Sequence, residues 1–148
     1  MKRALALLAF WPSVLPAQSL RDVLASAPEI SFTEWQSMTA GKTVVYEIDG
    51  QTYGYEHYSP NSNAVKIQLD DGTCIDGTWF MENNAFCFDW QGGPLNCFHH
   101  KQLDSTIYVI GLESGAETGE IQRVSRIAAI PVACGPALLS AYHPAVSQ

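Results

Sequence analysis

The residue types most capable of chemistry gather within residues 74–100, which hold three of the four cysteines and two of the four histidines. Such residues bind metal ions, form reactive thiol centres or form disulfides, according to their spacing and compartment. The cysteines are Cys74, Cys87, Cys97 and Cys134, and no two of them form a C-x-x-C pair. This spacing favours neither a zinc knuckle nor a thioredoxin-like redox centre.

His99 and His100 are adjacent in a segment whose sequence predicts a strand. Adjacent side chains of a strand point to opposite faces, so these two rings are poorly placed to share one ion. We therefore predict no metal site and no other cofactor. The remaining interpretation of the four cysteines is two disulfides, which require an oxidising compartment.

The first seventeen residues have the pattern of a signal peptide. Lys2 and Arg3 give a positive start, residues 4–15 form an apolar run, and Ala17 is a small residue before the expected cleavage site. The run is shorter than the roughly 20 apolar residues that a membrane-spanning helix needs. The sequence thus predicts a periplasmic or secreted protein, with no membrane insertion of the mature chain.

The charge of the chain narrows the classes of partner. Its 148 residues include 15 Asp and Glu against 8 Lys and Arg, a formal charge of −7. Loss of Lys2 and Arg3 with the signal peptide makes this charge −9. Because so acidic a chain repels phosphate backbones and anionic headgroups, we expect no nucleic-acid or membrane-surface role. A protein partner is expected, although no motif identifies it.

Residues 18–42 are predicted to form two short helices. Ser19 is a candidate N-cap of the first helix, and apolar residues follow it at helical spacing. Thr33 is the candidate N-cap of the second helix, which Gly41 would end.

From residue 43 the sequence changes to the period-2 alternation of β-strands. The expected strands cover residues 43–48, 51–58, 64–69, 74–81, 85–90, 95–100, 105–112 and 120–130. Tight turns separate them, and no connection is long enough for a parallel crossover. The predicted fold class is therefore mainly all-β, an antiparallel meander of about eight short strands that forms a curled sheet or a small up-and-down barrel. This β domain would extend over residues 43–134, before a C-terminal tail of residues 135–148.

Aromatic residues indicate what fills such a barrel. Phe86, Phe88 and Trp90 share one face of their strand, and Trp79 should lie near Phe88 across the Asn83-Asn84 turn. Aromatic alternation of this kind is more often core than ligand cage, so the sequence favours a filled interior over a pocket.

Hairpin register suggests how the cysteines pair. If residues 91–93 form a three-residue loop, Cys87 lies opposite Cys97 at the separation that a disulfide needs. Cys74 would then bond to Cys134 and close a loop of about sixty residues. The alternative joins Cys74 to Cys87 and Cys97 to Cys134. No strand register supports that arrangement, so it ranks second.

Several segments together resemble a known sequence pattern: TAGKTVVY, YGYEHYSPN, DDGTCIDGTWF, AFCFDW and NCFHH. They are similar to the pattern of small uncharacterised periplasmic proteins from alphaproteobacteria, over roughly residues 33–100. The resemblance implies a secreted, β-rich domain with disulfides. It implies no catalytic residues.

No catalytic residue can be assigned from motifs, because the chain contains neither G-x-S-x-G nor H-E-x-x-H. The best constellation for an enzyme consists of Glu56, His57, Asp76 and Asp89 on neighbouring strands. Glu56 and His57 should, however, face opposite sides of their strand.

The predicted function is a non-catalytic periplasmic binding or accessory module, including a subunit that docks on a larger envelope complex. Its candidate partner-binding residues are Tyr53, Tyr55, His57, Tyr58, Leu138, Leu139 and Tyr142. The alternative is a proteinaceous inhibitor of a secreted hydrolase, with residues 56–63 or 113–119 as its inhibitory loop. A small periplasmic enzyme ranks third.

Overall fold

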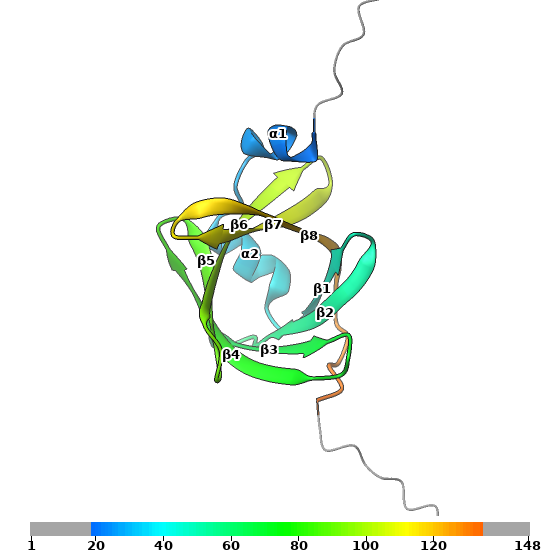
Figure 1. Cartoon of the computed structure of the whole chain (residues 1–148). Helices are drawn as coiled ribbons and strands as arrows, with labels where there is room; N and C mark the ends of the chain where they lie inside the picture. Colours follow the sequence, from blue (N-terminus) through cyan, green and yellow to red (C-terminus); the bar gives the residue numbers. More distant parts are fainter. Residues whose placement is uncertain (1–18, 135–148) are drawn as a thin grey trace, which may run out of the picture.

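The computed structural model describes residues 19–134 (Figure 1). The elements, in chain order, are α1 (Leu20–Ala25), α2 (Phe32–Thr39), β1 (Thr43–Ile48), β2 (Gln51–Tyr58), β3 (Ala64–Leu69), β4 (Cys74–Glu82), β5 (Ala85–Trp90), β6 (Leu95–Leu103), β7 (Thr106–Glu113) and β8 (Ala116–Ala128). The expected signal peptide and the expected tail of residues 135–148 lie outside the described residues.

The eight strands form a closed up-and-down barrel, which confirms the predicted fold class. Each strand pairs antiparallel with the next, and β1 pairs with β8 to close the ring. Closure leaves no unpaired strand edge in the barrel wall. Among the described residues no helix is both long and apolar enough to span a membrane.

Several predicted boundaries differ from those observed, including the end of β6 at Leu103 rather than residue 100. Two of the differences have a clear local reason. The N-cap of α2 is Ser31 rather than Thr33, because Ser31 and Glu34 form a reciprocal capping box. Strand β8 begins at Ala116, so most of the loop expected at residues 113–119 is strand. A turn at Ser114-Gly115, with both residues at positive φ, is enough to reverse the chain there.

Helix α2 closes one end of the barrel (Figure 1). Its Trp35 is fully buried, and the Trp35 ring centroid lies 4.5 Å from that of His100 and 5.8 Å from that of Tyr58. The segment before α2 adds to β6, where the Ile30 N–H donates to the His100 carbonyl over 2.8 Å. This end therefore has the filled aromatic core that the sequence predicts.

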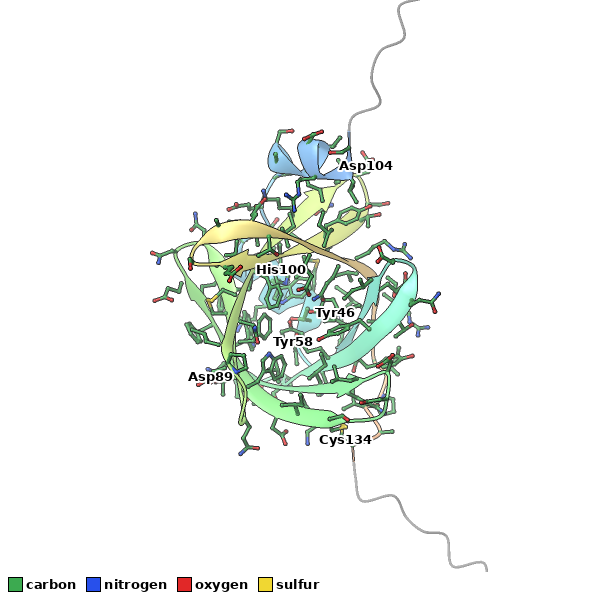
Figure 2. The ribbon with its side chains drawn as sticks, in the orientation of Figure 1. Tyr46, Tyr58, Asp89, His100, Asp104 and Cys134 are labelled. Atoms are coloured by element: carbon green, nitrogen blue, oxygen red, sulfur yellow. A yellow bond between two sulfur atoms is a disulfide. The ribbon has the colours of Figure 1, made fainter. Side chains whose placement is uncertain are left out.

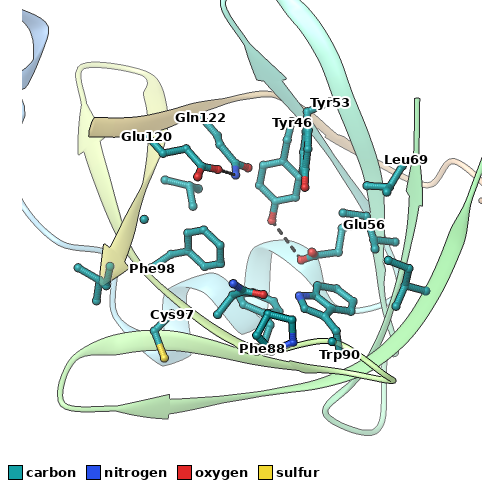
Figure 3. Close-up of a pocket in the computed structure, with 18 of the residues that line it drawn as sticks. Tyr46, Tyr53, Glu56, Leu69, Phe88, Trp90, Cys97, Phe98, Glu120 and Gln122 are labelled. Atoms are coloured by element: carbon teal, nitrogen blue, oxygen red, sulfur yellow. Dashed lines mark hydrogen bonds between the residues drawn. The ribbon is translucent and has the colours of Figure 1, made fainter. Parts of the chain in front are cut away.

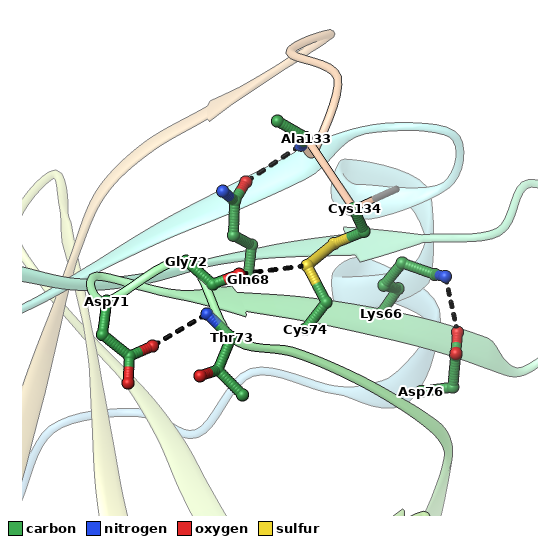
Figure 4. Close-up of a disulfide and its surroundings, with 9 residues drawn as sticks. All are labelled: Lys66, Gln68, Asp71, Gly72, Thr73, Cys74, Asp76, Ala133 and Cys134. Atoms are coloured by element: carbon green, nitrogen blue, oxygen red, sulfur yellow. Dashed lines mark hydrogen bonds and ion pairs between the residues drawn. A yellow bond between two sulfur atoms is a disulfide. The ribbon is translucent and has the colours of Figure 1, made fainter. Parts of the chain in front are cut away.

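Both disulfides have the predicted pairing. Cys87 lies opposite Cys97 in the β5–β6 register and is bonded to it. Cys74, at the start of β4, is bonded to Cys134 at a sequence separation of 60. Figure 4 shows this second bond beside Gln68, whose side-chain oxygen accepts a hydrogen bond from the Ala133 N–H at 2.9 Å. The segment after β8 is thus fixed to the outside of β3 and β4.

Candidate ligand-binding cavity

The end of the barrel opposite α2 contains a cavity of about 430 Å³. It lies within the ring of turns that joins β1 to β2, β3 to β4, β5 to β6 and β7 to β8, and Figure 3 shows its lining. The expectation of a filled interior was therefore wrong for this half of the barrel. Gly111 in the cavity wall lets Thr118 lie close to the backbone, since a Cβ on Gly111 would be only 3.0 Å from Thr118 Oγ1.

Aromatic rings form one wall of the cavity. Phe88 and Trp90 lie two positions apart on β5 and stack with a centroid separation of 5.6 Å. Phe98 on β6 meets Phe88 edge to face at 5.8 Å. Figure 3 shows all three side chains pointing into the same space, so the wall offers ring surface to any occupant.

Glu56 projects into the cavity from β2 and is only 4% exposed. Tyr46 Oη donates a hydrogen bond to Glu56 Oε1 over 3.2 Å (Figure 3). Tyr46 Oη also lies 3.3 Å from Tyr58 Oη, so three polar side chains form a connected group inside the barrel. A buried carboxyl group with hydroxyl partners is costly to ionise unless a further partner compensates its charge.

The environment of Glu56 changes its acid strength. Burial raises the pKa of Glu56 to about 7, while the hydroxyls of Tyr58 and Tyr46 act in the opposite direction. Burial, and after it the Glu56 charge, raises the pKa of Tyr46 and of Tyr58 well above the ordinary value. Near neutral pH the two phenols are therefore protonated, whereas Glu56 is divided between its charged and neutral forms.

His100 contributes to the cavity lining from β6, between the aromatic wall and Trp35. Its side chain points into the barrel (Figure 2) and is 1% exposed. Neither ring nitrogen has a hydrogen-bond partner of normal geometry among the described residues, although the backbone of Phe98 acts against the effect of burial on the His100 pKa. Burial lowers the pKa of His100 to about 3, so the ring is neutral at physiological pH. A buried imidazole without partners can donate or accept one bond to a ligand.

Polar side chains mark the mouth of the cavity on β8 and β2. Gln122 Nε2 donates to Glu120 Oε1 at 2.9 Å, and Thr118 also lines the mouth. Tyr53 is 39% exposed and lines the cavity on the same side as Gln122 (Figure 3). Burial and then the Glu120 charge raise the pKa of Tyr53, which indicates that these groups lie near one another.

The predicted partner-binding residues do not share one surface. Tyr53 lines the cavity mouth, whereas Tyr55 and His57 are half-buried on the outer face of β2. Tyr58 is 1% exposed and lies inside the barrel. The prediction that Tyr58 contacts a partner at the surface was therefore wrong. Its position follows from strand alternation, which turns Tyr58 to the same side as Glu56. The predicted residues Leu138, Leu139 and Tyr142 lie outside the described residues.

The structure does not assemble the enzyme constellation considered from the sequence. Glu56 points inward, while His57 on the outer face has its Nδ1 3.2 Å from Thr43 Oγ1. Asp76 forms an ion pair with Lys66 at 3.0 Å on the outside of the barrel, as Figure 4 shows. Asp89 is exposed. These side chains cannot act together on one substrate.

The two adjacent histidines point to opposite faces, as predicted. His100 is inside, whereas His99 Nδ1 lies 2.8 Å from Glu117 Oε1 on the outer face. Within residues 19–134 no three His, Cys, Asp or Glu side chains are grouped so that they could hold a metal ion.

Sequence reasoning missed the cavity residues, although one signal was present. Glu56 occupies an inward position of β2, between Gly54 and Tyr58, where period-2 alternation requires a core residue. A carboxylate at such a position is unusual for a packed core and indicates that the interior is polar there. Gln122 gives the same signal on β8.

Comparison of the chain with models of protein families, with curated proteins and with solved structures finds no match. No match therefore indicates what the cavity holds.

Proposed function

We propose that the protein is an exported, non-catalytic binding module that holds a small molecule with an apolar part inside its barrel. The observation that carries this proposal is the cavity of about 430 Å³ at the open end. Small-molecule sites are usually concave and mainly apolar, with a few polar groups that fix the orientation of the ligand. Barrels of eight strands are wide enough to hold one such ligand.

The distribution of polar groups supports binding rather than catalysis. Of the four side chains considered for an enzyme, only Glu56 lies in the cavity. General acid–base catalysis needs its base within hydrogen-bond reach of the reacting group, and His57, Asp76 and Asp89 do not line the cavity. The cavity instead offers a few hydrogen-bonding groups, Glu56, His100 and Gln122, beside an aromatic wall.

Export is part of the same proposal. It is supported by the signal-peptide pattern of residues 1–17 and by the two disulfides, which form in oxidising compartments. Mass spectrometry of the protein from its native cell envelope should find a chain that begins near Gln18. An intact N-terminus in the envelope fraction would contradict the proposed export.

Binding can be tested with a neutral apolar fluorophore, N-phenyl-1-naphthylamine. The wild-type protein should give a saturable fluorescence increase with a stoichiometry of one. Thr118→Trp, which places a large side chain at the mouth, should abolish this increase, because Thr118 lines the cavity. Arg126→Trp is the matched control, since Arg126 is exposed on the same strand. No saturable signal, or equal binding by both variants, would contradict the proposal.

A further inference from the structure

The charged residues of the cavity lining are all acidic. Two of its lining residues, Glu56 and Glu120, carry carboxyl groups, and no lysine or arginine lines it. The turns around the mouth add Asp49, Asp70 and Asp71 and contain no basic residue. Arg21, which is outside the lining, donates to the carbonyl of the lining residue Thr118 at 2.7 Å.

Two buried side chains in the cavity have incomplete partners within residues 19–134: Glu56 accepts a hydrogen bond from Tyr46 but has no ion-pair partner, and His100 has no hydrogen-bond partner. The Glu56 carboxylate has phenol hydroxyls near it but no positive group among the described residues. His100 has no hydrogen-bond partner at either ring nitrogen in the described part of the chain. Native proteins rarely leave such groups unsatisfied, and a ligand is one way in which they are satisfied.

Resting on the proposed function, we propose that the ligand is a small organic cation, an amine or quaternary ammonium with an apolar or aromatic tail. Its charge would lie at Glu56, and its apolar part would lie against Phe88, Trp90 and Phe98. Aromatic ring faces attract cations, and the attraction grows when water is excluded. A cation also compensates a buried carboxylate that is otherwise unpaired.

The same charges select against other ligands. An anionic headgroup would meet Glu56 inside and Glu120 at the mouth without a basic residue to neutralise it. The aspartates of the surrounding turns favour the approach of cations over anions. A neutral ligand could occupy the cavity but would leave the Glu56 charge without compensation.

Occupation by a cation makes binding depend on pH through Glu56. The groups that face Glu56 are Tyr46 on β1, Tyr53 and Tyr58 on β2, Ile67 on β3, His100 on β6, and Glu120 and Gln122 on β8. With a pKa of about 7, Glu56 is mostly ionised at pH 8 and mostly protonated at pH 6. Affinity for a permanent cation should thus be about tenfold lower at pH 6 than at pH 8.

Three probes with one tail and different headgroups test this ligand class by isothermal titration calorimetry. They are (3-phenylpropyl)trimethylammonium, neutral 3-phenyl-1-propanol and anionic 3-phenylpropanoate. At pH 8 we expect the cation to bind at least about tenfold more tightly than the alcohol. We expect the anion to bind least.

Two variants distinguish the effect of the Glu56 charge on cation binding from the effect of removing any carboxylate. Glu56→Gln keeps an acceptor for Tyr46 and should remove both the preference for the cation and its pH dependence. Asp89→Asn removes an exposed carboxylate of β5 and should change neither the preference for the cation nor the pH dependence of its binding. If Glu56→Gln does not fold, the wild-type pH series decides, because the charge of the quaternary ammonium does not change with pH.

The outcomes distinguish the two proposals. If the alcohol or the anion binds as tightly as the cation, and Thr118→Trp abolishes this binding, the cation proposal is overturned while the binding function stands. If none of the probes binds while N-phenyl-1-naphthylamine still does, the cation proposal is overturned and the binding function stands. If neither the probes nor the fluorophore binds, or if Thr118→Trp leaves their binding unchanged, both proposals are overturned. A cation affinity that is equal at pH 6 and pH 8 overturns the role of Glu56.

Discussion

At one end of the barrel α2 inserts Trp35 among Tyr58, Phe86 and His100, whereas at the other end the same strands enclose a cavity. The filled end is held by packing. The open end has less packing but carries covalent links, because Cys74 begins β4 and Cys97 follows the start of β6 by two residues. The difference shows how a small barrel can keep one end of its interior open, because packing at the other end and the disulfides stabilise the fold.

The largest expected effect comes from emptying the filled end. Trp35→Ala should lower the free energy of unfolding by about 3 to 5 kcal/mol, because it leaves a large void in a fully buried site. Phe98→Ala at the cavity should cost only about 1 to 2 kcal/mol, since Phe98 is half-buried and borders space already. Urea denaturation measures both. Equal losses would mean that the two ends do not differ in packing.

Removing the covalent links tests how the open end is held. Replacing Cys74 and Cys134 by Ser should destabilise the protein by about 4 kcal/mol, because this bond closes a loop of 60 residues. Replacing Cys87 and Cys97, at a separation of 10, should cost about 1.6 kcal/mol less, from the shorter loop alone. The measurement is the urea midpoint of each double variant. Equal midpoints would refute the loop-entropy argument.

A smaller effect is expected from Glu56, and its sign depends on pH. The pKa of Glu56 is about 7 in the folded protein against an ordinary value of 4.5, because burial disfavours the charged form, so the folded state holds its proton more tightly. Stability from this source is complete below about pH 4.5 and is lost as the pH rises through about 7. Glu56→Gln should thus be more stable than wild type by about 3 kcal/mol at pH 8. The difference should vanish near pH 4.

Thermal or urea unfolding at pH 4, 6 and 8 checks that prediction. His100 changes stability in the opposite sense, because its pKa is lowered and its contribution is lost as the pH falls from about 6.5 towards 3. Comparing the variant with wild type at each pH cancels this contribution, since both proteins contain His100. A constant difference across the three pH values would show that Glu56 is not held in an unfavourable environment.

Local rules predicted most of the barrel from its sequence. The alternation of β1 to β5 gave strand bounds close to those observed, and the Gly-rich loop after Trp90 gave the register that joins Cys87 to Cys97. The start of β8 was missed, because Gly119 and its neighbours have loop composition but continue a ladder closed by a two-residue turn. Tertiary pairing overrides local propensity at such places.

The cavity was not predictable from the same rules. Phe86 and Trp90 lie on one face of β5, yet Phe86 packs against Trp35 of α2 whereas Trp90 lines the cavity. Which of them is core depends on the end of the barrel that α2 closes. That choice is a long-range contact which no local pattern encodes. Glu56 was noticed as a carboxylate, but its burial required the closed ring of strands.

The central claim is that one end of the barrel is filled and the other end binds a ligand, and tryptophan indole signals test it most directly. Trp35 and Trp79 belong to the filled core, whereas Trp90 lines the cavity. In a ¹H–¹⁵N NMR titration with (3-phenylpropyl)trimethylammonium at pH 8, the Trp90 indole signal should shift and saturate at one equivalent. The signals of Trp35 and Trp79 should stay nearly unchanged. Shifts centred on Trp35 and Trp79, or no saturable shift of Trp90, would contradict the account.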